Sequence, residues 1–198
     1  EAGQSAVVTF VITWHFPNLV MMNTRSKSKT AEKLVQEGGR YYAAKFLSEE
    51  EGAKIIGIGE WDCVVSNPAG LKIEELNQWR KDSGSIRNFP GGQTNPRPDA
   101  VWDIECDILI PAALENQITA QNAPSIRARI LTEGANGPTT PEAHRILHEK
   151  GVFVIPDILA NSGGVTTSYF EWVQDRYGYF WPVEDVNLRL EKKMSEAL

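Results

Sequence analysis

Short apolar runs recur along the chain, separated by longer stretches in which apolar residues return with a helical period. The runs cover Ala6–Ile12, Lys54–Ile58, Asp107–Pro111 and Gly151–Pro156, and a shorter one covers Arg129–Leu131. Apolar and polar residues do not alternate within them, which is typical of strands buried on both faces of a parallel sheet.

Helical patterns fill most intervals between these expected strands. They cover Thr30–Glu51, Lys72–Lys81, Asn116–Ala123 and Pro141–Glu149, and two terminal helices are expected around Tyr169–Trp172 and Val186–Ala197. Strands that alternate with helices predict an α/β fold, with a doubly wound, mostly parallel sheet and helices on both faces. The stretch Lys81–Pro98 is rich in Gly, Pro, Asn and Ser, which predicts a surface loop.

The helix expected at Pro141–Glu149 has the clearest end signals. Thr140 stands at the N-cap, a proline follows at the first helical position, and Glu142 suits the positive end of the helix dipole. Lys150 and Gly151 supply a cation and a stop residue at the other end.

Composition excludes several classes of partner. The 198 residues carry 26 acidic and 20 basic side chains, a net charge of -6, and an acidic surface repels phosphate backbones. We therefore expect no nucleic-acid partner. No apolar run approaches the roughly 18 residues of a spanning helix, so we expect no membrane partner either. Cys63 and Cys106 are expected as buried, reduced thiols in a cytosol-like compartment.

Candidate chemistry lies just after the expected strands, because ligands of open parallel sheets bind outside the carboxyl ends of the strands. Glu60 follows the second run, where an acid can accept hydrogen bonds from both hydroxyls of an adenosine ribose. A solvated loop acid is the alternative. Ala112 and Ala113 follow the third run, where small residues either admit a flat ligand or allow tight helix packing.

Two asparagines follow the later strands. Asn136 stands between Gly134 and Gly137, and its amide offers both a donor and an acceptor. Asn161 precedes a Gly-Gly turn and a helix start, an arrangement suited to holding a carboxamide such as nicotinamide. Each feature is weak alone, since Asn-Gly and Gly-Gly are common loop dipeptides. Four such features at successive strand ends predict a binding site.

Other reactive side chains have simpler interpretations. His144 and His148 are four residues apart and share a helix face, but two ligands do not make a zinc site. We expect two surface histidines and no metal. The basic run Arg25–Lys29 is expected as a solvated loop.

Several motifs together resemble the cofactor domain of glutamate dehydrogenase, in the family of glutamate, leucine, phenylalanine and valine dehydrogenases. These are Gly57–Glu60, Asn67–Gly70, Ile110–Ala113 with Glu115–Gln117, Glu133–Pro141 and Pro156–Trp172. The resemblance runs from about Gly39 to Leu198. It implies a Rossmann-like dinucleotide-binding domain over residues 1–198, and reversible oxidative deamination of L-glutamate to 2-oxoglutarate and ammonia, with NAD as cofactor and NADP possible.

The resemblance also implies residue roles. Glu60 would bind the adenosine ribose, Ala112 would line the cofactor cleft, and the nicotinamide ribose and carboxamide would lie near Asn136 and Asn161. Val165 and Ser168 would face the substrate, with the Ser168 hydroxyl holding the distal carboxylate of glutamate. A homo-oligomer, a hexamer in the family, is implied, in the cytoplasm or, for a eukaryotic source, the mitochondrial matrix.

The sequence departs from the family in two places. Residues 13–39, with Trp14, His15, Phe16 and Pro17, stand where the family has a glycine-rich turn that cradles the pyrophosphate. The family's catalytic lysines and aspartate lie on an N-terminal domain absent from this sequence, so we expect a piece of a longer chain, inactive alone and without catalytic residues of its own. The alternative is a truncated or degenerate dehydrogenase fragment with no activity and weak or no dinucleotide binding.

Overall fold

The computed structural model describes residues 8–13 and 53–197. Contacts divide the chain into two compact units, Glu1–Leu109 with Ser125–Ala128 and Ile110–Pro124 with Arg129–Leu198, referred to below as the first and second unit. The helix expected at Thr30–Glu51 and, apart from Thr13, the departure at residues 13–39 lie outside the described residues.

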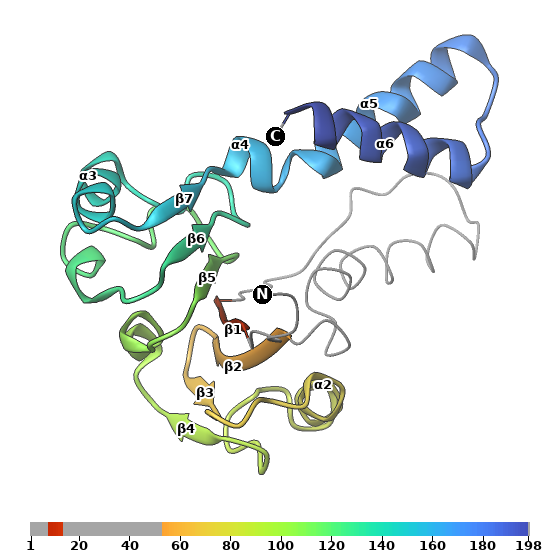
Figure 1. Cartoon of the computed structure of the whole chain (residues 1–198). Coiled ribbons are helices and arrows are strands. Elements are labelled where there is room, and N and C mark those ends of the chain that lie inside the picture. The colour runs from red at the N-terminus through yellow and green to blue at the C-terminus, as the bar shows by residue number, and fades with distance from the viewer. Residues whose placement is uncertain (1–7, 14–52, 198) are drawn as a thin grey trace, which may run out of the picture. The chain divides into compact units, whose positions relative to one another are not determined.

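The first unit is built on strands in the order β4-β3-β2-β1 (Figure 1). They comprise β1 (Val8–Thr13), β2 (Ala53–Gly59), β3 (Val64–Ser66) and β4 (Gln93–Asn95). The β1 and β2 strands are parallel, as the sequence predicts, whereas β3 pairs antiparallel with both β2 and β4. The three-residue strands β3 and β4 are too short to leave a periodic signal in the sequence.

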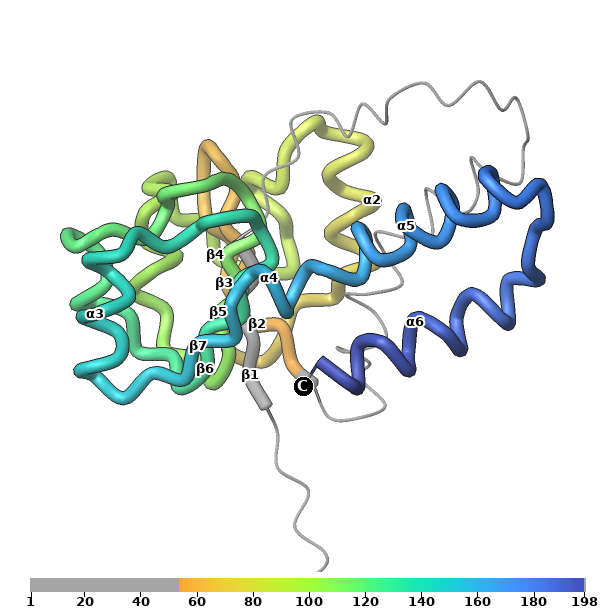
Figure 2. Tube along the Cα trace, turned by 90° about the horizontal axis from the view of Figure 1, so that it is seen from above, coloured from red at the N-terminus to blue at the C-terminus, as the bar shows by residue number. Residues whose placement is uncertain are grey.

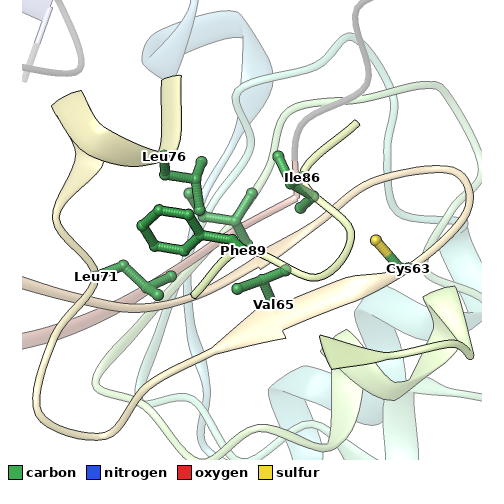
Figure 3. Packing of buried hydrophobic residues seen from close by; sticks show 7 residues of the cluster. Cys63, Val65, Leu71, Leu76, Ile86 and Phe89 are labelled. Carbon is green, nitrogen blue, oxygen red and sulfur yellow. The ribbon is translucent and has the colours of Figure 1, made fainter. Parts of the chain in front are cut away.

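The prediction of a surface loop over Lys81–Pro98 is wrong in part. This stretch contains β4, and it also sends Ile86 and Phe89 into the interior, where they are 1% and 4% exposed. They pack with residues of β2, β3, the loops and α2 in the cluster of Figure 3, which comprises Ile58, Cys63, Val65, Leu71, Leu76, Ile86 and Phe89. Burial of these side chains outweighs the loop-like composition around them.

Helix α2 (Ile73–Ser83) matches the helix expected at Lys72–Lys81. It buries Leu76 and ends at Gly84, whose φ of 81° lies in the left-handed region that a helix stop favours. The Trp79 indole Nε1 donates to the Arg87 carbonyl at 3.1 Å and the ring meets Phe89 edge-on, which fixes the loop after the helix. The same unit contains a 3-10 turn, η2 (Pro98–Asp103).

The second unit contains a parallel strand–helix–strand crossover. Strand β6 (Ile130–Thr132) leads through α3 (Pro141–Glu149) to β7 (Phe153–Ile155), which pairs parallel with β6. The chain passes from the first unit to the second within β5 (Ile108–Pro111). The parallel pairs and the helices between strands confirm an α/β fold.

The predicted ends of α3 are confirmed. The Thr140 hydroxyl accepts from the Ala143 amide at 3.3 Å, and the helix stops at Lys150 before Gly151, whose φ is 76°. The helix buries Ala143 and Leu147 completely, which fixes one face against the unit.

The helix expected at Asn116–Ala123 does not form. Ile118 instead adopts an extended bridge to Thr139, with its amide donating to the Pro138 carbonyl at 2.8 Å. Asn116 has a φ of 55°, which an α-helix does not allow. The Ile118 side chain is fully buried in this extended conformation. Within this stretch only the turn η3 (Ala123–Ser125) is helical.

Helices α4 (Asp157–Ala160), α5 (Ser162–Tyr177) and α6 (Val183–Ala197) complete the second unit and confirm the two expected terminal helices. Figure 2 shows α5 and α6 running side by side in opposite directions. Trp181 joins them, because its ring packs edge-on against Phe170 and lies 4.3 Å below the Arg189 guanidinium. No helix among the described residues is both long and apolar enough to cross a membrane.

Candidate functional site

A cavity of about 560 Å³ opens in the second unit. Its lining comes from the segments that follow β5 and β6 and from the start of α5, and comprises Ala113, Leu114, Glu115, Gly134, Ala135, Asn136, Asn161 and Val165. The volume is in the range of small-molecule sites, which commonly measure 300–1,000 Å³. The lining lies at the carboxyl ends of the strands, the edge where ligands of parallel sheets bind.

The two predicted asparagines meet in this cavity. Asn161 Nδ2 donates to Asn136 Oδ1 at 2.8 Å and approaches the Gly134 carbonyl at 3.4 Å. Among the described residues, Asn161 Oδ1 and Asn136 Nδ2 keep no other partner, so the pair offers one acceptor and one donor to a ligand. The Gly-Gly turn expected after Asn161 is instead the first turn of α5.

A buried carboxylate lies in the same loop as Asn136. Glu133 is 3% exposed, and its Oε2 accepts from the Asp157 amide at 3.0 Å, while its Oε1 lies 3.2 Å from His144 Nε2. Asp157 in turn accepts from the Gly137 amide at 2.8 Å. These contacts tie the loop after β6 to the first turn of α4.

Of the two histidines expected at the surface, only His148 is exposed. The partly buried His144 contacts Glu133 and belongs to this set of contacts.

Ala112 lies beside the cavity rather than in its lining. A Cβ built on Gly134 would come within 3.1 Å of the Ala112 Cβ and 3.5 Å of the Pro111 carbonyl oxygen. Ala113, the neighbouring small residue, lines the cavity, so the role expected of Ala112 in the cofactor cleft stays a prediction.

The two residues expected to face substrate lie on the same helix. Val165 is 69% exposed and lines the cavity. Ser168, three residues further along α5, is exposed and donates its hydroxyl to the Gly164 carbonyl at 3.2 Å. Ser168 is not a lining residue, so its expected role stays a prediction.

Glu60 lies in the first unit, directly after β2. Its amide donates to the Cys63 carbonyl at 2.8 Å, which forms a tight turn, and its side chain is 8% exposed. Arg80 Nε on α2 lies 2.7 Å from Glu60 Oε1. The acid is therefore not the solvated loop residue of the alternative interpretation, but one member of an ion pair.

The rest of this turn is also built of paired groups. Asp62 Oδ2 lies 3.2 Å from Arg87 Nε and accepts from the Ser85 hydroxyl at 3.1 Å. Burial, reinforced by the Asp62 carboxylate, raises the pKa of the Cys63 thiol to about 11. Cys63 and Cys106 are both buried and outside any disulfide, as predicted.

Sequence reasoning did not identify Arg80 or Glu133 as functional residues. Glu133 carried the same signal as Glu60, an acid directly after a strand, and could have been singled out on that ground. Arg80 carried none, because the sequence does not show which helical cation will meet an acid twenty residues earlier.

Comparison with known proteins shows the family of the chain. The model of the glutamate/leucine/phenylalanine/valine dehydrogenase family matches residues 21–198. The chain belongs to this family. Its members are amino-acid dehydrogenases, which are oxidoreductases.

Individual relatives are similar over most of the chain. The glutamate dehydrogenase of Thermotoga maritima is 46% identical over 158 residues, which are 79% of this chain and 37% of the relative. The NAD-specific glutamate dehydrogenase of Staphylococcus aureus is 48% identical over 157 residues, with the same coverage. This chain thus spans little more than a third of the length of these relatives.

A solved structure supports the fold. A hetero-hexameric glutamate dehydrogenase from Thermus thermophilus superimposes with a TM-score of 0.71 at 24% identity, covering 98% of this chain and 40% of that one.

Proposed function

We propose that this chain is the cofactor-binding part of a glutamate dehydrogenase, which interconverts L-glutamate with 2-oxoglutarate and ammonia and transfers hydride to NAD or NADP. Family membership and the names of the two relatives support the reaction. We assign residues 1–198 to one dinucleotide-binding domain of the doubly wound, Rossmann-like type, in which β1, β2, β6 and β7 supply parallel strands.

The Asn136–Asn161 pair carries this proposal. The nicotinamide carboxamide has one carbonyl acceptor and one amino donor, and the pair presents a matching donor and acceptor at a cavity wall. The bonds that join Glu133, Gly137 and Asp157 tie the loop that contains Asn136 to the helix α4 that precedes Asn161, so little ordering is required when a ligand binds. When bound, the nicotinamide would accept hydride from the α-carbon of the amino acid.

The remaining roles follow from position. We assign Glu60 to the adenosine ribose, Val165 to the wall beside the nicotinamide, and Ser168 to the substrate carboxylate. An acid at the ribose hydroxyls favours NAD, and the NAD-specific relative supports that preference. Ala112 holds the loop of Gly134 against the cavity, which keeps the backbone close to the ligand.

The catalytic groups would come from outside this chain. We propose that they belong to the part of the relatives that this chain does not span, and that the protein works within a homo-oligomer, a hexamer by analogy with the family. The bacterial sources of the relatives support a cytoplasmic location.

Titration calorimetry of NADH into the 198-residue chain tests the proposal. We expect saturable binding, and we expect Asn161→Ala to weaken it by about tenfold, the value of one or two lost hydrogen bonds. Asn77→Ala, an exposed position on α2, is the matched control and should bind as the wild type does. Absence of binding by a folded chain would favour the degenerate fragment, to which the aromatic residues Trp14 and Phe16 in place of a glycine turn already point.

A further inference from the structure

The acid assigned to the adenosine ribose is not alone. Glu60 is nearly buried, while the Arg80 side chain that meets it at 2.7 Å is 38% exposed. Arg80 stands in the last turn of α2, which Leu76 anchors in the core. A cation that remains accessible to ligands therefore covers the carboxylate from a rigid helix.

Two neighbouring cations, Arg87 and Lys81, do not pair with Glu60. Arg87 is committed to Asp62, to which its Nε and Nη2 both bond. Lys81 follows Arg80 on the helix but is exposed and turned by one helical step, about 100°, from the ion pair. Among the described residues, Arg80 is thus the cation best placed to act beside Glu60.

This arrangement changes what the ribose end of a dinucleotide would meet. A lone carboxylate at the ribose repels a 2′-phosphate, whereas a paired one repels it less because the guanidinium offsets its charge. The guanidinium can also donate to phosphate oxygens directly, in the fork geometry that makes Arg the usual ligand of such groups.

We propose that Arg80 is a specificity-determining residue, which allows NADP to bind beside Glu60 and without which the site selects NAD. This inference rests on the proposed function, since it places the ribose at Glu60. It concerns only the preference between two nucleotides that differ by one phosphate.

Calorimetric titration of NADH and NADPH into the 198-residue chain and its variants tests the proposal. We expect the wild type to bind both nucleotides and Arg80→Ala to lower the affinity for NADPH relative to NADH by about tenfold. Arg80→Lys keeps the charge and should change the ratio by no more than about threefold. Lys81→Ala removes an equal charge from the next position and should leave the ratio unchanged.

A second pair of variants isolates the coupling between the two residues. Glu60→Ser frees the guanidinium, so the preference should move toward NADPH by about tenfold, and Glu60→Ser/Arg80→Ala should lose this gain. Circular dichroism shows whether each variant is folded. If Arg80→Ala fails to fold, Arg80→Gln takes its place.

The outcomes separate the two proposals. The role of Arg80 is overturned if Arg80→Ala has the same ratio of NADPH affinity to NADH affinity as the wild type. It is also overturned if Lys81→Ala changes this ratio as much as Arg80→Ala does. Neither outcome contradicts nucleotide binding itself. A folded wild-type chain that binds neither nucleotide overturns the proposed function, and this inference with it.

Discussion

His144 Nε2 lies 3.2 Å from Oε1 of Glu133, a carboxylate that is almost completely buried. The contact joins α3 to the loop after β6, and the other oxygen of Glu133 joins the same loop to α4. One side chain thus connects the loop after β6 with α3 and with α4.

Glu133→Gln tests this connection. A glutamine presents one oxygen where the carboxylate presents two. It therefore cannot keep both the hydrogen bond from the Asp157 amide and the oxygen that lies 3.2 Å from His144 Nε2. We expect the free energy of unfolding to fall by about 1–3 kcal/mol, the cost of an unsatisfied buried group. Urea denaturation measures it. Glu149→Gln, exposed on α3, should stay within about 0.5 kcal/mol of the wild type, and equal losses in both variants would contradict the prediction.

Two glycine-to-alanine variants should have opposite effects. At Gly92 a Cβ would come within 2.7 Å of a Val65 methyl and 3.1 Å of the Ser66 carbonyl oxygen, so we expect a loss of about 1–3 kcal/mol. At Gly164, in the first turn of α5, nothing lies within 4 Å, and we expect a gain of about 0.5–1 kcal/mol. Thermal unfolding of both variants and the wild type measures these changes in stability. The same sign of change in both would contradict the packing described here.

The Cys63 thiol predicts a pH dependence of stability. Its pKa of about 11 in the folded chain lies above the ordinary value of 9.0, so the unfolded chain loses this proton first. The contribution of this pKa difference to the free energy of unfolding is complete below pH 9. It is lost as the pH rises through 11, so the free energy of unfolding falls by about 2–3 kcal/mol. The fall should be missing in Cys63→Ala when urea unfolding of the two proteins is compared across pH 8–11. Parallel profiles would show that the thiol is not protected.

The N-cap of α3 predicts a smaller effect. Thr140→Ala removes the acceptor of the Ala143 amide, and we expect a loss of about 1 kcal/mol. Thr140→Ser keeps the hydroxyl and should recover most of that loss. Chemical denaturation gives the free energy of unfolding of the wild type and the two variants. An alanine variant as stable as the serine variant would show that the cap hydroxyl contributes nothing to stability.

Sequence patterns predicted the elements whose signals are local. The apolar run of β2 and the capped helix α3 were both predictable, because burial and end signals are contained in one segment. Ile118 was misassigned because its extended pairing depends on Thr139, a partner twenty-one residues away. The β3–β4 pair was missed because each strand has only three residues, too few to leave a periodic signal.

In the candidate site, too, local signals predicted some residues and missed others. Asn136 and Asn161 could be proposed from residue type and their place after strands, and the structure brings them to 2.8 Å. The contacts of Glu60 with Arg80 and of Glu133 with His144 depend on helix orientation, which the sequence does not show.

Strand β4 has a consequence for the solution behaviour of the first unit. It ends the described sheet on one side, and an open strand edge is a template for pairing with another molecule. This edge is only three residues long, Gln93–Asn95, and Pro90 and Pro96 on either side cannot donate to a further strand. Such a short edge with prolines nearby offers little backbone for sheet extension, which limits aggregation through this strand.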